Sequence, residues 1–182
     1  MTITRFLSSR RIASVVVAVA ATIAAVVVPA GTAQADGFDL WMQNIETDQY
    51  LTIGNASHTD GAAAIQWTYL SGYEQQWDFI KVTDLQGDDN DKWIIRNAHS
   101  LQCLAIPASS RVNGTGAIQW PCLAVDDQRW YLRLDSYLGG YKIVNVNSDK
   151  CLAIPEGSDA LGKQAIQWTC AQDLDQRWTL WY

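Results

Sequence analysis

The sequence predicts an all-β fold assembled from three related units, each with four short strands, or about twelve strands in total. One sequence motif occurs three times, as AIQWTYLSGYEQQW at 64–77, AIQWPCLAVDDQRW at 117–130 and AIQWTCAQDLDQRW at 165–178. Turn residues separate short runs with period-two alternation, and no apolar stripe of helical spacing follows residue 35. Self-similarity over a long period is typical of a unit that packs on its own copies because it cannot bury its apolar face alone.

The three units keep a common register, with steps of 53 and then 48 residues. This register places the repeats at about 38–82, 92–135 and 140–182. In each repeat a segment YLTI or CLAI precedes this motif at the same spacing, starting at Tyr50, Cys103 and Cys151. The five extra residues of the first step lie in the acidic loop TDLQGDDND, 83–91, which we expect at the surface.

The strand-like runs also predict the core. In the second repeat these runs are KWIIRN, QCLAI, GAIQW and RWYLRL. Asp-Gly at 60–61 and Asn-Gly at 113–114 favour tight hairpin turns between the middle runs. Residues two apart on a strand share a face, and this pairs Trp77 with Phe79, Trp130 with Leu132 and Trp178 with Leu180. We expect the three tryptophans to meet around a pseudo-threefold axis.

Residues 1–35 have the three-part layout of a secretory signal peptide. A basic stretch precedes the apolar run 12–28, and small residues follow in Ala33-Gln34-Ala35. A transmembrane anchor is the alternative, but about 17 apolar residues are fewer than the roughly 20 that a crossing helix needs. We therefore predict export, cleavage after Ala35 and a mature domain of 36–182.

The charge of the mature chain disfavours two classes of partner. Of the 13 Lys and Arg, three lie in the export segment, so 10 remain against 19 Asp and Glu and the net charge is near −9. Such a surface repels phosphate backbones and anionic lipid headgroups. We expect no nucleic-acid or membrane binding, and the remaining length suits one domain, which we expect to be a monomer.

A triple Gln-x-Trp signature resembles that of the ricin B-type β-trefoil lectin domain. Its members are Gln75 with Trp77, Gln128 with Trp130 and Gln176 with Trp178, and cysteines accompany CLAI and W-x-C in the last two repeats. The resemblance covers essentially all of 37–182. It implies a β-trefoil of three lobes, in agreement with the strands above, and a lectin-like binding of carbohydrate.

Four cysteines in an exported chain suggest two disulfides. Equal spacing of 19 residues within a repeat favours one of the three possible connectivities. It joins Cys103 to Cys122 and Cys151 to Cys170. The first repeat has Tyr50 and Tyr69 at the equivalent places, where we expect an aromatic contact instead.

No catalytic or metal-binding constellation is evident in the sequence. The two histidines, His58 and His99, do not recur in register and lie in no catalytic signature. The acidic run 88–91 lacks the ordered ligand loop and terminal Glu of a calcium site, which indicates a solvated turn. We expect a protein that is not an enzyme and that uses no cofactor or metal.

Three further tryptophans are candidates for sugar binding. They lie ten residues before the signature tryptophans, at Trp67, Trp120 and Trp168. The family resemblance implies that this position supplies the flat ring on which a sugar stacks, since the C–H face of a sugar suits an aromatic surface. The alternative is that the rings only cover the disulfides and the lobe cores.

The sequence departs from the family's sugar-binding pattern in every repeat. The family's aspartate after CL is replaced by Thr52, Ala105 and Ala153. Its glutamine two residues before the platform is replaced by Ile65, Ile118 and Ile166. The usual charge-assisted contact to sugar hydroxyls is therefore absent from these positions.

Other polar residues near the platforms have different expected roles. Three acids beside the signature glutamines offer another hydrogen-bond acceptor, namely Glu74, Asp127 and Asp175. By strand alternation, Gln66, Gln119 and Gln167 point away from the platforms and are not counted as partners.

The sequence favours a secreted carbohydrate-binding module of weak or altered specificity, with up to three related sites and a repetitive polysaccharide as its partner. The alternative is a protein-binding or inhibitor-like trefoil that has lost sugar binding and uses its loops, for example 83–91 and 107–116. Three symmetric sites favour the first interpretation, and loss of all three aspartates favours the second.

Overall fold

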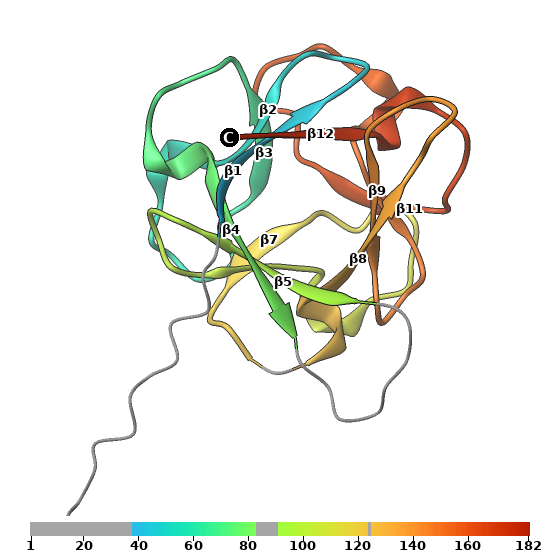
Figure 1. Cartoon of the computed structure of the whole chain (residues 1–182). Coiled ribbons are helices and arrows are strands. Elements are labelled where there is room, and N and C mark those ends of the chain that lie inside the picture. The colour runs from blue at the N-terminus through green and yellow to red at the C-terminus, as the bar shows by residue number, and fades with distance from the viewer. Residues whose placement is uncertain (1–37, 83–90, 124) are drawn as a thin grey trace, which may run out of the picture. The chain divides into compact units, whose positions relative to one another are not determined.

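The computed structural model describes residues 38–82, 91–123 and 125–182, and its twelve strands confirm the predicted all-β fold class (Figure 1). The predicted export segment, 1–35, and most of the acidic loop, 83–90, lie outside the described residues. Lobe 1 contains β1 (Phe38–Asn44), β2 (Tyr50–Ile53), β3 (Ala64–Trp67) and β4 (Gln76–Val82). Lobe 2 contains β5 (Lys92–Asn97), β6 (Cys103–Ala105), β7 (Ile118–Trp120) and β8 (Arg129–Leu134). Lobe 3 contains β9 (Tyr141–Asn145), β10 (Cys151–Ala153), β11 (Ile166–Trp168) and β12 (Trp178–Trp181).

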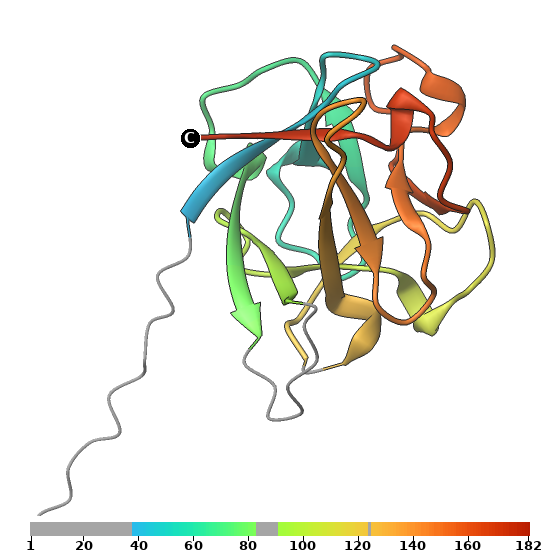
Figure 2. The same ribbon diagram turned by 45° about the vertical axis from the view of Figure 1, so that its right-hand side comes forward.

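Six of these strands close into an antiparallel barrel. Going round it, β1 pairs with β4, β4 with β5, β5 with β8, β8 with β9, β9 with β12, and β12 with β1 again. Each lobe supplies its first and last strand to this ring, which Figures 1 and 2 show from two directions. Every barrel strand is thus paired on both sides, and closure protects the sheet edges.

The two middle strands of each lobe form an outer hairpin. These hairpins are β2–β3, β6–β7 and β10–β11, and each pairs with the first strand of its own lobe. Isolated bridges join neighbouring hairpins, between Ala63 and Ile118, Ile65 and Gln164, and Gly116 and Ile166. The three hairpins therefore hold one another as well as the barrel.

The signature tryptophans form the core, as the alternation predicts. Trp77, Trp130 and Trp178 are 0% exposed and belong to one apolar cluster. Their indole Nε1 atoms donate to the carbonyl oxygens of Leu51, Leu104 and Leu152, each at 3.0 Å. Phe79 is buried in the same cluster, and Leu132 and Leu180 pack against it. Each large ring is thus buried without leaving its polar atom unpaired.

Two sets of buried glutamines hold the loops around this core. In lobe 1 the signature Gln75 accepts a hydrogen bond from Leu70 N at 2.6 Å and donates to Thr68 O at 2.8 Å. Gln128 and Gln176 make the equivalent contacts in lobes 2 and 3. These bonds satisfy buried main-chain groups, so they fix the loop that follows each platform tryptophan.

The second glutamine set joins the lobes. Gln119 of lobe 2 donates to Ser57 O at 2.8 Å and to Thr59 O at 3.0 Å in lobe 1. Gln66 and Gln167 make the same bonds to the neighbouring lobe in each case. All three side chains are 0% exposed and turned inward, in agreement with the alternation.

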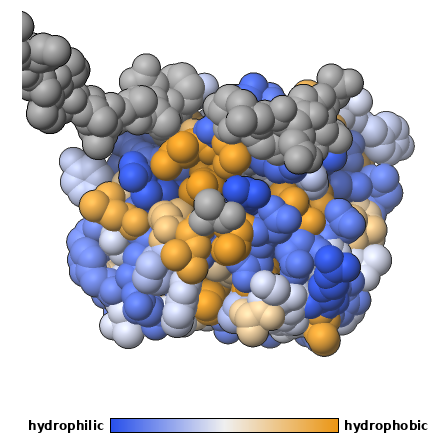
Figure 3. Space-filling model, turned by 90° about the horizontal axis from the view of Figure 1, so that it is seen from below, coloured by the Kyte–Doolittle hydropathy of each residue, from blue (hydrophilic) through white to orange (hydrophobic). Residues whose placement is uncertain are grey.

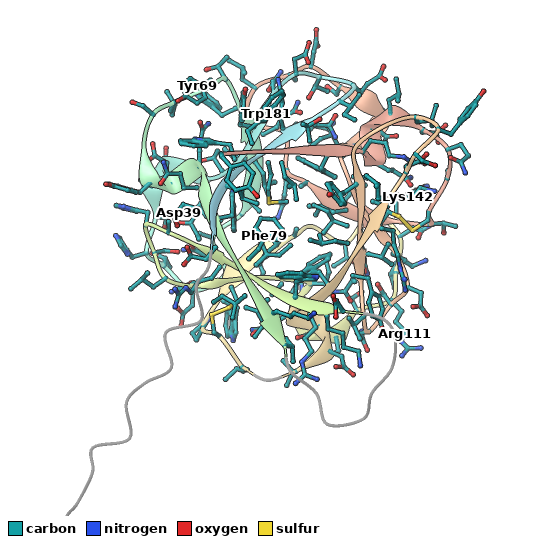
Figure 4. All side chains as sticks on the ribbon, viewed as in Figure 1. Asp39, Tyr69, Phe79, Arg111, Lys142 and Trp181 are labelled. Atoms are coloured by element: carbon teal, nitrogen blue, oxygen red, sulfur yellow. A yellow bond between two sulfur atoms is a disulfide. The ribbon has the colours of Figure 1, made fainter. Side chains whose placement is uncertain are left out.

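Disulfides join Cys103 to Cys122 and Cys151 to Cys170, the two pairs that the spacing favours (Figure 4). The Cα atoms of the pairs are 5.0 and 5.1 Å apart. At the equivalent place in lobe 1 the rings of Tyr50 and Tyr69 meet edge to face, with centroids 5.3 Å apart. Lobe 1 thus replaces a covalent link by an aromatic contact.

The surface of the described part is mixed in character. Figure 3 shows one face on which apolar residues gather in a patch with hydrophilic residues around it. Over the described ranges we find no helix with the length and apolarity that a membrane crossing requires.

Candidate carbohydrate-binding site

Each lobe carries one open pocket on its outer hairpin. In lobe 2 its floor contains Ala105 of β6 and Ile118 of β7, which lie directly opposite each other. The corresponding pairs are Thr52 with Ile65 in lobe 1 and Ala153 with Ile166 in lobe 3. The two departures from the family pattern are therefore cross-strand neighbours. Together they make the floor largely apolar.

Thr52 is the one floor residue of the three pairs with a side-chain polar group, and that group is already engaged. Its Oγ1 donates to the carbonyl oxygen of Glu74 at 3.1 Å. The threonine is 4% exposed. The hydroxyl therefore supports the wall of the pocket in lobe 1.

The platform tryptophans stand at the edge of these pockets with part of each ring in solvent. Trp67, Trp120 and Trp168 are 36%, 41% and 45% exposed. They line the pockets of lobes 1, 2 and 3 in turn. Part of each ring is therefore accessible from solvent, whereas the signature Trp130 is fully buried.

A glycine turn from a neighbouring lobe supports each ring. A Cβ on Gly61 would lie 3.6 Å from Cζ3 of Trp120, and the amide of Gly61 donates to Gln119 O at 2.9 Å. Gly61 has φ of +82°, which side-chain-bearing residues rarely adopt. Gly114 and Gly162 hold Trp168 and Trp67 in the same way. The platforms are therefore positioned between lobes.

The three candidate acids come from 3₁₀ helices that precede the last strand of each lobe. Helices η2 (Tyr73–Gln75), η4 (Asp126–Gln128) and η6 (Leu174–Gln176) supply Glu74, Asp127 and Asp175. The main chain of Asp127 is fixed, because its carbonyl oxygen accepts from Ile106 N and from Asn145 Nδ2, both at 3.0 Å. The structure thus brings each candidate acid into the pocket of its platform.

The carboxylates of lobes 2 and 3 have different surroundings. Asp127 Oδ2 accepts from Ser109 N at 3.2 Å and from Ser109 Oγ at 2.9 Å. Burial raises the pKa of Asp175, and the negative charges of Asp173 and Glu46 raise it further. Asp127 is therefore held by hydroxyl and amide donors, while Asp175 lies in a negative field.

A strained turn forms the opposite wall of each pocket. The turns are η1 (Gly54–Ala56), η3 (Pro107–Ser109) and η5 (Pro155–Gly157). In η3 Ala108 and Ser109 have φ of 54° and 49°, and the last two residues of η1 and η5 are also left-handed. The non-glycine residues in this conformation cost about 1–3 kcal/mol each, and such residues cluster at ligand-binding sites. These left-handed turns recur in all three lobes, and they line the same pockets as Trp67, Trp120 and Trp168.

The three pockets differ in size. The cavity volume is about 650 Å³ in lobe 3, about 290 Å³ in lobe 1 and about 160 Å³ in lobe 2. Sites for small molecules generally measure about 300–1,000 Å³. Lobe 3 therefore has room for the largest ligand.

Three acidic residues of the lobe 3 pocket were missed by sequence reasoning, namely Glu46, Glu156 and Asp173. Overlaying the repeats could have drawn attention to Glu156 and Asp173, since neither is acidic in the other copies. Glu46 belongs to lobe 1 in sequence, and only closure of β1 on β12 brings it to lobe 3.

The remaining candidates for chemistry lie elsewhere. His58 and His99 contact each other, with ring centroids 4.4 Å apart, and neither lines the three pockets. Among the residues that the structure describes, no three His, Cys, Asp or Glu side chains converge so as to hold a metal ion.

Solved structures with the same architecture include a designed protein and natural ones. The designed threefold-symmetric protein ThreeFoil is 30% identical over 79% of this chain and 97% of its own, with a TM-score of 0.71. An exo-β-1,3-galactanase from Clostridium thermocellum is 25% identical, with a TM-score of 0.70, and the match covers 80% of this chain but 30% of the galactanase. The Macrolepiota procera ricin B-like lectin, solved with lactose, is 20% identical over 81% of this chain and 98% of its own, with a TM-score of 0.64.

A search of curated proteins found no match. The family profile described as "Ricin-type beta-trefoil lectin domain" matches residues 40–178, which include all three pockets. With the closed barrel, the three hairpins and the triple Gln-x-Trp signature, this match shows that the chain belongs to the ricin-type β-trefoil lectin domain family.

Proposed function

We propose that this protein is an exported, non-catalytic carbohydrate-binding module that engages repetitive polysaccharides through three weak sites. The observation that supports this most directly is the coincidence, in every lobe, of a half-exposed tryptophan, a carboxylate and a pocket. An aromatic ring can stack on the C–H face of a sugar while a carboxylate accepts hydrogen bonds from its hydroxyls. These are the two interactions that a sugar site needs.

Weak binding at each lobe follows from the apolar floor. The family pattern places an acceptor after CL, whereas Ala105 and Ala153 offer none and Thr52 is engaged with Glu74. Stacking contributes only about 0.5–1.5 kcal/mol beyond area burial. A single galactose should therefore bind weakly or not at all.

Three related sites compensate for weak individual binding when the ligand repeats. After one lobe has bound a long polysaccharide, contact by a second lobe is effectively intramolecular, and avidity can exceed the affinity of either site by about 10²–10⁴-fold. Long chains should thus bind where monosaccharides do not.

Family membership and the ligands bound in the structures of its relatives also support the proposal. The Macrolepiota procera lectin was solved with lactose, and an earthworm R-type lectin of the same fold was solved with GalNAc. In the galactanase the matched part is 30% of the chain, as expected for a module attached to an enzyme. The proposed module acts outside the cell as a monomer and leaves catalysis to other proteins.

The decisive experiment compares the mature wild-type domain with the triple variant Trp67→Ala, Trp120→Ala and Trp168→Ala. Pull-down on a panel of insoluble polysaccharides measures the binding of long chains. Calorimetry with galactose measures the binding of the monosaccharide. We expect the wild type to bind at least one polysaccharide and the triple variant to lose at least tenfold in affinity, since each stacking contact is worth about 0.5–1.5 kcal/mol.

A matched control is Trp181→Ala, which removes a 50% exposed tryptophan that lines none of the three pockets. This variant should bind like the wild type. Polysaccharide binding that survives the triple change would place the site elsewhere, and absence of any glycan binding by the wild type would favour a protein partner.

A further inference from the structure

The pocket of lobe 3 differs from the other two in charge. Four carboxylates from three segments line it, namely those of Glu46, of Glu156 in η5, and of Asp173 and Asp175 at η6. The half-exposed ring of Trp168 lines the same cavity, and none of its described lining residues is basic. The largest pocket therefore combines an aromatic ring with concentrated negative charge.

The chain's own repeats provide an internal comparison for this charge. The four equivalent positions for lobe 2 hold Asn147, Ala108, Val125 and Asp127, and the last three of these line its pocket. The equivalent positions for lobe 1 hold His99, Asn55, Gly72 and Glu74, and of these Asn55 and Glu74 line its pocket. One position is acidic in every lobe, and the other three are acidic in lobe 3 alone. The shared scaffold does not require the extra acids, so they distinguish the ligand of lobe 3.

The carboxylates of this pocket act on one another. The pKa of Asp175 is raised chiefly by burial and then by the charges of Asp173 and Glu46. Arg177 lies nearby, but it is 0% exposed and its charge is paired with Asp135 at 2.9 Å. A positively charged ligand group would relieve the repulsion among the carboxylates.

We propose that the lobe 3 pocket selects amino sugars with a free, protonated amine, within an oligosaccharide or polysaccharide. The sugar ring stacks on Trp168, and its ammonium group lies among the four carboxylates. This inference rests on the proposed function and names the ligand class of one of its three sites. Lobes 1 and 2, with one carboxylate each, accept neutral sugars.

The arrangement fits an amino sugar better than a small cation. The carboxylates are spread around a cavity of about 650 Å³ instead of meeting at one point. The half-exposed ring of Trp168 and the apolar Ala153 and Ile166 of the floor suit the C–H face of a sugar, which a small cation lacks.

The test compares two ligands that differ in charge and share a backbone: a β-1,4-linked glucosamine hexasaccharide and its N-acetylated counterpart. Calorimetry on the mature protein, with EDTA present and at a mildly acidic pH, should show tighter binding of the glucosamine form. The double variant Glu156→Gln with Asp173→Asn should reduce this preference by about four- to twenty-fivefold, at about two- to fivefold for each carboxylate. Added salt should weaken the preference in the wild type.

Two controls separate the pocket from the overall negative charge. Asp60→Asn with Asp149→Asn removes two exposed acids that line none of the three pockets, and it should retain the preference. Trp168→Ala should abolish the preference, whereas Trp120→Ala should not.

Equal binding of the two hexasaccharides by the wild type would overturn the inference, as would an equal loss in the control double variant. Binding of an oligolysine peptide with the same dependence on Glu156 and Asp173, but of neither sugar, would assign the pocket to a basic peptide instead. In each case the triple tryptophan variant on neutral polysaccharide still decides the proposed function independently.

Discussion

At the scale of single residues, two carboxylates lie directly opposite each other on neighbouring strands of the barrel. Asp39 of β1 lies across from Asp78 of β4, whose Oδ2 accepts from Arg96 Nε and Nη2 at 2.9 and 2.7 Å. A hydrogen bond to Asp78, then burial, then repulsion by Asp78 raise the pKa of Asp39 to about 6. Figure 4 labels Asp39. The folded state thus binds a proton here more tightly than the unfolded chain does.

This shift predicts a pH-dependent stability with a definite sign. The contribution of Asp39 is fully present below its ordinary pKa of 3.8 and is lost as the pH rises through about 6. Asp39→Asn can donate to Asp78 at every pH, so we expect it to be more stable than the wild type at neutral pH and nearly equal near pH 4. Urea unfolding over this range measures both, and parallel stability profiles of the two proteins would contradict the assignment.

At the scale of elements, the three outer hairpins have the same strand register but are linked differently. Lobes 2 and 3 each have a disulfide, whereas lobe 1 has an aromatic contact. Cys103 lies opposite Trp120 and Cys151 opposite Trp168, and each cysteine is bonded two residues beyond the tryptophan. In lobe 1 Tyr50 lies opposite Trp67 in the same register. Its ring contacts Tyr69, which also packs against Trp41 with centroids 6.1 Å apart.

The shared register predicts that Tyr50→Cys with Tyr69→Cys forms a third disulfide. Closing the 19-residue separation, as in the other lobes, should stabilise the variant by about 3 kcal/mol relative to the same variant without the bond. The matched control is Tyr50→Ser with Tyr69→Ser, which loses the aromatic contact equally. Thiol titration and urea unfolding measure the result, and two free thiols in the oxidised variant would show that the lobe 1 hairpin differs in geometry.

At the scale of the whole molecule, closure of the barrel makes the three lobes one folding unit. Strand β12 pairs with β1, so the end of lobe 3 completes lobe 1, and Asn44 of β1 donates to Asp175 O at 2.8 Å. The signature tryptophans belong to one apolar core cluster, to which all three lobes contribute residues. Removal of one core ring should therefore destabilise the entire domain.

The two tryptophan sets should differ sharply in their effect on stability. Trp130→Ala removes a ring that is 0% exposed and should lower the free energy of unfolding by about 3–5 kcal/mol. Trp120→Ala removes a ring that is 41% exposed and should cost much less. Urea unfolding followed by near-UV and far-UV circular dichroism should give coincident transitions for both. Equal losses would mean that Trp120 belongs to the core.

The sequence by itself determined the architecture, because every sequence feature that predicts this architecture repeats along the chain. Steps of 53 and 48 residues, the Gln-x-Trp signature and the 19-residue cysteine spacing were enough to predict three lobes, twelve strands, the core tryptophans and the pairing of the cysteines. Local alternation also separated the inward Gln119 from the outward Trp120. Such features depend on residues within one lobe, where order in sequence and neighbourhood in space agree.

Only the tertiary structure decided what meets between lobes. Glu46 is a lobe 1 residue that lines the pocket of lobe 3, and the turn of Gly162 in lobe 3 supports Trp67 of lobe 1. Both contacts arise because the barrel closes by joining β12 to β1, across more than a hundred residues of chain. No periodicity within a repeat specifies which neighbour a turn will reach. The size and charge of each pocket therefore depend on closure, whereas its platform depends on the repeat.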